Sequence, residues 1–241
     1  DKGIIIAGTG NTLRVEDQAT ASSAGYGQIE GSSNQAIVDN ATWNGGAIYV
    51  TGTDNTLTVQ NGGSVTGGDV RSRQGSGSNA TITVTGGTVT ANGHFYVGTG
   101  TATGANVNVT GPSALLRTVS YDMHIGQSGT NNTMTVSAGG TVTSNRQTYV
   151  GELDSATGNR LIVTGEGSLF RSGTNQWWAE RLYVGTAVAG NNTVEVSAGG
   201  TLDTLGIIVG AATGNAVINT GGVYQFGYAN PVLTPGGGGI H

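Results

Sequence analysis

The chain has 241 residues, of which 45 are Gly, 9 are basic, 14 are acidic and none is Cys. A charged fraction of only 10%, with Val, Ile and Leu recurring throughout, excludes a disordered polyelectrolyte, and three Pro are too few for collagen. The net charge of −5 argues against nucleic acid and anionic membrane surfaces as partners. Without Cys there are no disulfides, thiolate metal sites or Cys nucleophiles. No apolar run approaches the ~18 residues of a membrane helix, so no membrane insertion by this segment is expected.

A five-residue block with alternating apolar side chains recurs along the chain. Its consecutive copies lie 23 to 33 residues apart, most often 25 or 27. Alternation of this kind predicts a strand with one buried face, and a period near 25 with variable insertions is typical of stacked coils joined by loops. The central apolar residues of the clear copies are Leu57, Ile82, Val107, Met134, Leu161, Val194 and Val217.

Two further short strands are expected in each repeat. One follows a Gly pair, as at Gly140-Thr-Val-Thr, and the other ends in Gly, as in Phe95-Tyr-Val-Gly. The pattern therefore predicts an all-β protein, a single-stranded parallel β-helix (β-solenoid) with three short strands per coil and eight to nine coils. By analogy with crossover connections we expect it to be right-handed. The solenoid should span residues 1–226, followed by an extended Gly/Pro-containing tail at 227–241.

An Asn stands just before the first strand of most repeats. Because equivalent residues of successive coils lie ~4.8 Å apart, stacked amides can hydrogen-bond along the solenoid. We interpret this column as structural, in keeping with the preference of Asn for turns. Its members are Asn11, Asn55, Asn132, Asn159, Asn192 and Asn215.

Two longer motifs carry a resemblance to a known class of proteins. Asn-Asn-Thr-x-x-Val-Ser-Ala-Gly-Gly-Thr occurs at 131–141 and 191–201, and Gly-x-x-Ser/Ala-Leu-x-Arg at 111–117 and 165–171. Over about residues 30–226 the repeats resemble those of type V-secreted autotransporter passengers and related exosortase-sorted bacterial surface proteins. The resemblance implies an extracellular or bacterial cell-surface location. It leaves function open, because such passengers range from adhesins to enzymes.

The third strand of each repeat should present an outward column rich in aromatic rings. Such a column could bind sugars by stacking, or it could only stabilise the sheet through ring pairs between neighbouring strands. The register is ambiguous near Arg71–Gln74. A second candidate is the loop 175–180, because its two adjacent Trp cannot both face the core of a strand. The candidate binding residues are Tyr49, Tyr96, His124, Tyr149, Tyr183, Trp177 and Trp178.

One group of titratable residues falls beside the aromatic column. His94 and Asp122 are expected at one position of adjacent coils, with His124 next to Tyr96. This group could bind a metal or perform acid–base chemistry. Against both uses stand the flat face of a solenoid and the lack of a second carboxylate or a nucleophile within reach. We therefore expect no catalytic residue, no metal or other cofactor, and no enzyme.

The ends of the predicted solenoid carry apolar strands without a recognisable cap. Repeat proteins need capping units for solubility, so the segment should continue into a longer chain or associate end to end with other copies. The expected function is an extracellular structural protein: a stalk, matrix or fibre unit. The alternatives are an adhesin that binds glycans and, more distantly, a polysaccharide-active enzyme. The candidate assembly residues are Ile4, Ile5, Ile6, Tyr224, Phe226, Val232 and Leu233.

Overall fold

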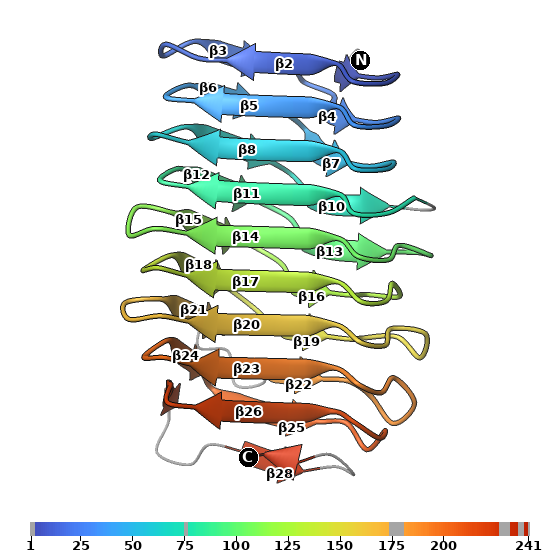
Figure 1. Ribbon diagram of the computed structural model, residues 1–241, viewed down its shortest axis with the longest axis vertical. Coiled ribbons are helices and arrows are strands. Elements are labelled where there is room, and N and C mark those ends of the chain that lie inside the picture. Colours follow the sequence, from blue (N-terminus) through green and yellow to red (C-terminus); the bar gives the residue numbers. More distant parts are fainter. Residues whose placement is uncertain (1–2, 75–76, 174–180, 227–231, 236–238, 241) are drawn as a thin grey trace.

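The computed structural model shows a β-solenoid of about eight turns, with three strands in each coil (Figure 1). It describes residues 3–74, 77–173, 181–226, 232–235 and 239–240, and no helix occurs among them. The strands form three parallel sheets of ten, ten and nine strands. The predicted fold class and the three strands per coil are therefore confirmed, while the right-handed coiling of the solenoid stays a prediction.

Except at the two ends, every strand pairs with its equivalents in the coils before and after it, so each sheet runs the length of the solenoid. Sheet 1 contains β1 (Ile4–Ile6), β4 (Tyr26–Ile29), β7 (Ala47–Val50), β10 (Val70–Gln74), β13 (Phe95–Thr99), β16 (Met123–Ile125), β19 (Thr148–Val150), β22 (Leu182–Val184), β25 (Gly206–Val209) and β28 (Val232–Pro235). Sheet 2 contains β2 (Thr12–Val15), β5 (Gln35–Asp39), β8 (Thr56–Gln60), β11 (Thr81–Thr85), β14 (Asn106–Thr110), β17 (Thr133–Ser137), β20 (Arg160–Thr164), β23 (Thr193–Ser197), β26 (Ala216–Thr220) and β29 (Gly239–Ile240). Sheet 3 contains β3 (Thr20–Ser22), β6 (Thr42–Asn44), β9 (Ser64–Gly67), β12 (Thr88–Ala91), β15 (Leu115–Thr118), β18 (Thr141–Ser144), β21 (Leu169–Ser172), β24 (Thr201–Thr204) and β27 (Val223–Phe226).

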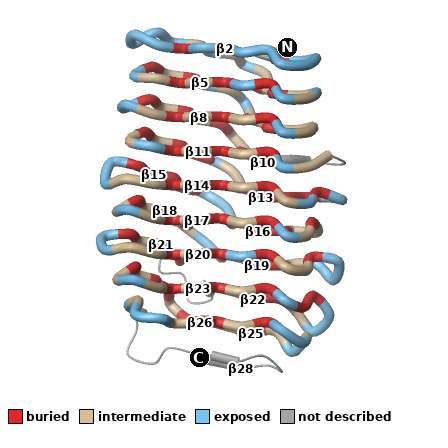
Figure 2. Tube along the Cα trace, viewed as in Figure 1, coloured by how far each residue is buried: buried red, intermediate tan, exposed pale blue. Residues whose placement is uncertain are grey.

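The core is a set of apolar columns that run along the solenoid axis (Figure 2). In sheet 2 the register places Leu57 beside Ile82 and Ile82 beside Val107, and all three are completely buried. Small branched side chains fill most of the narrow interior, with Trp43 and Phe170 among the few large ones. Burying each Val, Leu or Ile contributes about 1.5–3 kcal/mol to the free energy of folding. Most strands bury one or two such side chains.

The Gly pair between the first and second strands meets two separate geometric demands. Gly139 adopts a φ of +85°, which an L side chain rarely takes. Gly140 passes so close to the preceding coil that a Cβ would lie 2.4 Å from the carbonyl oxygen of Val109. Ala138, just before the pair, also has a positive φ of 50°. The turn therefore tolerates a side chain only where it points away from the neighbouring coil.

The predicted Asn column is confirmed as a hydrogen-bonded ladder. The Oδ1 of Asn159 accepts from the backbone N–H of Asn132, while its own N–H donates to the Oδ1 of Asn192. The Nδ2 of Asn159 also donates to the carbonyl of Gly129 in the preceding corner. The structure adds Asn34 to the ladder. Two adjacent coils break it, because buried Ala80 and Ala105 stand at the positions between Asn55 and Asn132.

The two ends differ in how they finish. At the N-terminal end β1, β2 and β3 are edge strands, and Ile5 is half exposed. At the C-terminal end β28 pairs with β25 and β29 with β26, so these segments continue sheets 1 and 2 in register. Within the described residues, no helix is long and apolar enough to cross a membrane. The division into a solenoid and a tail stays a prediction.

Candidate functional site

Sheet 1 carries the predicted aromatic column on its outer face. The register aligns Tyr96 with His124, His124 with Tyr149, and Tyr149 with Tyr183. Phe95 and Val97 flank Tyr96 along the strand and are completely buried in the core. Alternation along the strand therefore turns the rings outward, as the sequence predicts. We call Tyr49, Arg71, Tyr96, His124, Tyr149 and Tyr183 the aromatic ladder.

The rings of the aromatic ladder stack on one another. Their centroids lie 4.7 Å apart for Tyr96 and His124, 5.3 Å for His124 and Tyr149, and 5.0 Å for Tyr149 and Tyr183, with interplanar angles of 7° to 16°. Only 7% of Tyr96 and 3% of His124 are exposed. The ring faces are thus used within the protein, which favours the stabilising interpretation of the column over sugar stacking on these faces.

Arg71 occupies the position where the sequence left the register ambiguous. It aligns with Tyr49 in one direction and Tyr96 in the other. Its guanidinium carbon lies 5.5 Å from the ring centroid of Tyr49 and 4.6 Å from that of Tyr96, which are cation–π distances. Asp69 holds the guanidinium in place with an ion pair of 2.8 Å. The ladder is continuous from Tyr49 to Tyr183 because Arg71 takes the place of a ring.

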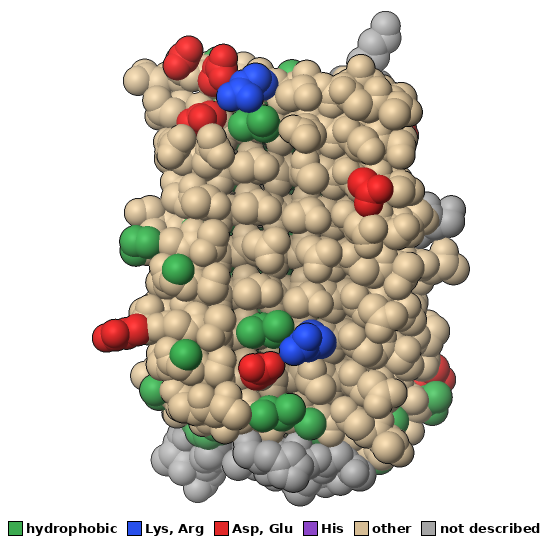
Figure 3. All heavy atoms as spheres, in the orientation of Figure 1, with side chains coloured by type: hydrophobic (Ala, Val, Ile, Leu, Met, Phe, Trp, Pro, Cys, Tyr) green, Lys and Arg blue, Asp and Glu red, His purple; other side chains and the backbone are tan. Residues whose placement is uncertain are grey.

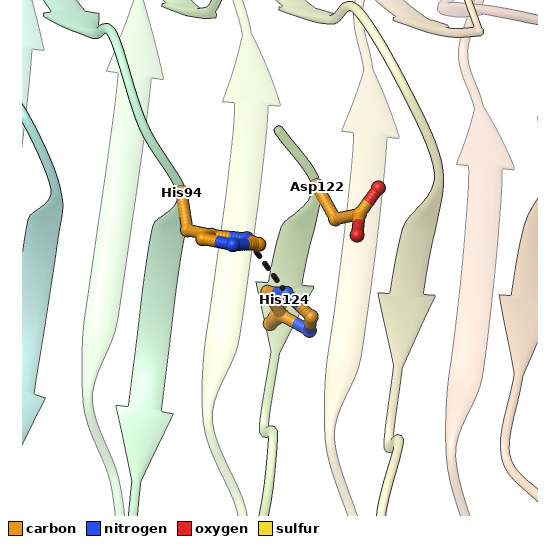
Figure 4. A group of neighbouring side chains, drawn as sticks. All are labelled: His94, Asp122 and His124. Atoms are coloured by element: carbon orange, nitrogen blue, oxygen red, sulfur yellow. Dashed lines mark hydrogen bonds between the residues drawn. The ribbon is translucent and has the colours of Figure 1, made fainter. Parts of the chain in front are cut away.

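The predicted histidine group is brought together beside this ladder (Figure 4). We call His94, Asp122 and His124 the histidine cluster. His94 and Asp122 precede the aligned strands β13 and β16, while His124 lies inside β16. The Nδ1 of His94 and the Nε2 of His124 are 3.4 Å apart, and potential ligand atoms of all three residues lie within 4.8 Å of one another.

Glu152, from the corner that follows β19, completes the surroundings of His124. Its Oε2 lies 2.8 Å from the Nδ1 of His124. Both atoms are buried, and their mutual approach does not have hydrogen-bond geometry, so each lacks a well-formed hydrogen bond. The sequence showed Glu152 only as an acidic residue of a corner loop. Its contact could be found only by placing that corner one coil beyond His124.

Two aspartates hold the backbone around the cluster. The Oδ1 of Asp69 accepts from the backbone N–H of His94, and the Oδ1 of Asp122 accepts from that of Gln147. Asp69 and Asp122 lie in the same column, one coil on either side of His94. Burial, reinforced by the neighbouring His124, lowers the pKa of His94 below its ordinary value, against the opposing charges of Asp69 and Asp122. His94 therefore favours the neutral form, in which a ring nitrogen can act as a ligand or hydrogen-bond acceptor.

A shallow cleft of about 300 Å³ lies near the C-terminal ends of β13, β16 and β19. It is lined by small and hydroxyl-bearing corner residues, without a charged or aromatic side chain, and this lining offers little chemistry. The lining residues are Gly100, Thr101, Ala102, Ser128, Gly129, Thr130 and Ser155.

The remaining candidate residues are not brought into this site. Trp177 and Trp178 lie outside the described residues. Ile4, Ile5 and Ile6 form β1 at one end of sheet 1, and Val232 and Leu233 belong to β28 at its other end.

Tyr224 and Phe226 lie in the edge strand β27 and are partly buried against the core. The use of either end in assembly stays a prediction.

Comparison of the chain with protein-family models, with curated proteins and with solved structures found no match.

Proposed function

We propose that this protein is a rigid structural element, a stalk, matrix or fibre unit at the bacterial cell surface or outside the cell. The observation that carries the proposal is the continuous pairing of the strands in all three sheets, from the first coil to the last. Separating two neighbouring coils along the axis must break hydrogen bonds in three sheets at once. The buried Asn ladder and the stacked rings add further contacts along the same axis.

The composition of the surface supports a structural role. The face that carries sheet 2 shows few charged and few hydrophobic side chains (Figure 3). Threonines line much of its outer side, as in the aligned residues Thr56 and Thr81. Outer side chains of this kind are small and uncharged, whereas binding and catalytic sites are usually concave with convergent polar groups. The proposed surface location follows the resemblance of the repeats to autotransporter passengers.

End-to-end contact belongs to the same proposal. Edge strands with unpaired backbone groups favour pairing with another chain, and a head-to-tail contact that does not close produces filaments. The test is electron microscopy and sedimentation of the purified chain over a wide concentration range. Rods of uniform width that lengthen with concentration would support the proposal. A compact particle that deforms readily would contradict it, and so would a catalytic activity of the purified chain.

A second candidate function is glycan binding, as in an adhesin. One observation favours it: the ring of Tyr121 is about half exposed and lies 4.8 Å from the ring of His94, so an open aromatic face adjoins the ladder. A glycan array would reveal such binding. Under this candidate Tyr121→Ala, or replacement of Trp177 and Trp178, abolishes the signal, whereas the outward Thr83→Ala in sheet 2 leaves it unchanged.

A further inference from the structure

The histidine cluster has features that a purely structural ring stack does not require. His124 is the one imidazole among the tyrosines of the aromatic ladder, and a second imidazole approaches it edge to edge from the preceding coil. A direct N–H···N hydrogen bond at 3.4 Å is long, beyond the usual 2.7–3.2 Å of protein N–H···O bonds. The spacing of the two nitrogens thus also fits an ion held between them.

We propose that His94, His124 and Asp122 bind a divalent transition-metal ion of the zinc class. Zinc binds imidazole nitrogen at about 2.0–2.1 Å, and two nitrogens on one tetrahedral ion lie about 3.3 Å apart. The observed separation of 3.4 Å between His94 Nδ1 and His124 Nε2 matches that value. Two imidazoles and one carboxylate, with water in the fourth position, form a set of ligands that zinc commonly takes.

The surroundings of His124 hold it ready for such a role. Its ring lies between the rings of Tyr96 and Tyr149, nearly parallel to both, which fixes its plane. Its Nδ1 lies 2.8 Å from Oε2 of Glu152, an ion-pair distance without hydrogen-bond geometry, so a rotation of the carboxylate is needed to complete the hydrogen bond when metal binds. Metal-bound histidines commonly donate their other N–H to a carboxylate, which fixes the tautomer and leaves the far nitrogen free for the metal. Glu152 is therefore a positioning residue, and Nε2 is the metal-binding atom.

Asp122 supplies the third ligand by a rotation of its side chain. One of its carboxylate oxygens accepts from the backbone N–H of Gln147, which anchors the group. In Figure 4 the carboxylate points away from the two imidazoles, so a rotation must bring one oxygen toward them; potential ligand atoms of the three residues lie within 4.8 Å of one another. The ion would join residues that belong to adjacent coils, with Glu152 reaching in from a third. Bound metal should therefore also stabilise the fold.

The test is metal binding to the full chain after treatment with a chelator. Isothermal titration with Zn²⁺ should give one site per chain, and Co²⁺ should give the visible absorption of a tetrahedral complex. We expect His94→Ala to abolish the Co²⁺ absorption and to weaken Zn²⁺ binding at least tenfold. Glu152→Gln should keep the stoichiometry and weaken binding about 10–100-fold, as measured for carboxylates that orient metal-bound histidines.

The chain offers matched controls for these variants. His241→Ala removes the only other histidine, outside the described residues, and should leave binding unchanged. Asp122→Asn and Asp54→Asn both remove one carboxylate charge and both keep a side-chain oxygen that can accept a hydrogen bond, but only Asp122 belongs to the cluster. Only Asp122→Asn should weaken binding. Thermal unfolding without metal will show whether each variant is folded.

Two outcomes would overturn the proposal. One is that the wild-type chain binds neither Zn²⁺ nor Co²⁺ at millimolar concentration, which would leave His94 and His124 as a hydrogen-bonded pair only. The other is that folded His94→Ala and Asp122→Asn bind the metal as tightly as the wild type. The proposal does not depend on the structural function proposed above, since metal binding is measured by titration and Co²⁺ absorption, whereas assembly into rods is measured by microscopy and sedimentation.

Discussion

The side-chain amide of Asn159 lies directly against Gly126, in the corner of the preceding coil. A Cβ on Gly126 would be 2.1 Å from the Cγ of Asn159. The same arrangement recurs where Asn192 lies against Gly151 and Asn215 against Gly185. The glycines that follow β16, β19 and β22 are therefore required by the Asn of the next coil, which links two motifs that are far apart in the sequence.

Gly126→Ala should destabilise the protein well beyond the cost of a positive φ. That cost alone is roughly 1–2 kcal/mol. The control is Gly62→Ala, since Gly62 has a similar φ of +81° but no atom within 4 Å of its added Cβ. Urea unfolding of both variants separates the two effects. Equal losses of unfolding free energy would show that the contact with Asn159 is unimportant.

Asn159→Ala should lower the unfolding free energy by several kcal/mol. The change removes the acceptor of the Asn132 N–H and the donor to the Gly129 carbonyl, and each buried polar group left without a partner costs about 1–3 kcal/mol. Asn108→Ala, on the outer side of β14, is the control and should cost little. Denaturation by urea measures both. A loss of unfolding free energy below about 1 kcal/mol for Asn159→Ala would show that the Asn hydrogen bonds contribute little to stability.

Ala138→Gly should stabilise the protein by about 1 kcal/mol, because Ala138 has a φ of 50° that glycine adopts without strain. Ala91→Gly, at the last residue of the regular strand β12, should have the opposite sign and cost about 0.5–1 kcal/mol. Differential scanning calorimetry gives both values. If the two variants shift the melting temperature in the same direction, the strain at Ala138 is not significant.

Alkaline pH should weaken the fold through Tyr149. Burial, with the charges of Asp122, Tyr183 and Glu152, raises the pKa of Tyr149 from 10.0 to about 12. The folded state therefore holds the phenol proton more tightly than the unfolded state. Its contribution to stability is fully present below pH 10 and is lost as the pH rises from 10 to about 12.

Unfolding measured across this pH range should show a smaller loss of stability for Tyr149→Phe than for the wild type. Tyr96 and Tyr224 also have raised pKa values, so part of the dependence should remain in the variant. The control is Tyr121→Phe, whose ring is about half exposed and which should behave as the wild type. An identical pH profile for Tyr149→Phe would count against the raised pKa.

The fold was predictable because stacking makes each coil a template for the next. A period near 25, alternating apolar residues and corner glycines were enough to place the inward and outward side chains, including Phe95 and Tyr96. The proximity of His94, Asp122 and His124 followed from the same register.

The contacts of Glu152 and Arg71 could not be predicted from the sequence, because the repeat does not specify the positions of these side chains. Glu152 reaches His124 from an irregular corner, whose path no periodicity gives. Arg71 was hidden because the strand Val70–Gln74 departs from the usual ending in Gly, which blurred the register. Residue type alone also does not indicate that an Arg will take the place of a ring in an aromatic column.

The break in the Asn ladder has a mechanical consequence. Ala80 and Ala105 leave two consecutive corners without an amide, while the coils on both sides keep theirs. Under tension along the axis, the coils without these amide hydrogen bonds should be the first to separate. His94 lies between these two alanines in the chain. An ion bound by His94 and by the next coil would therefore join the two coils that lack the amide contact. Pulling single molecules with and without Zn²⁺ would then reveal one rupture event whose force depends on the metal.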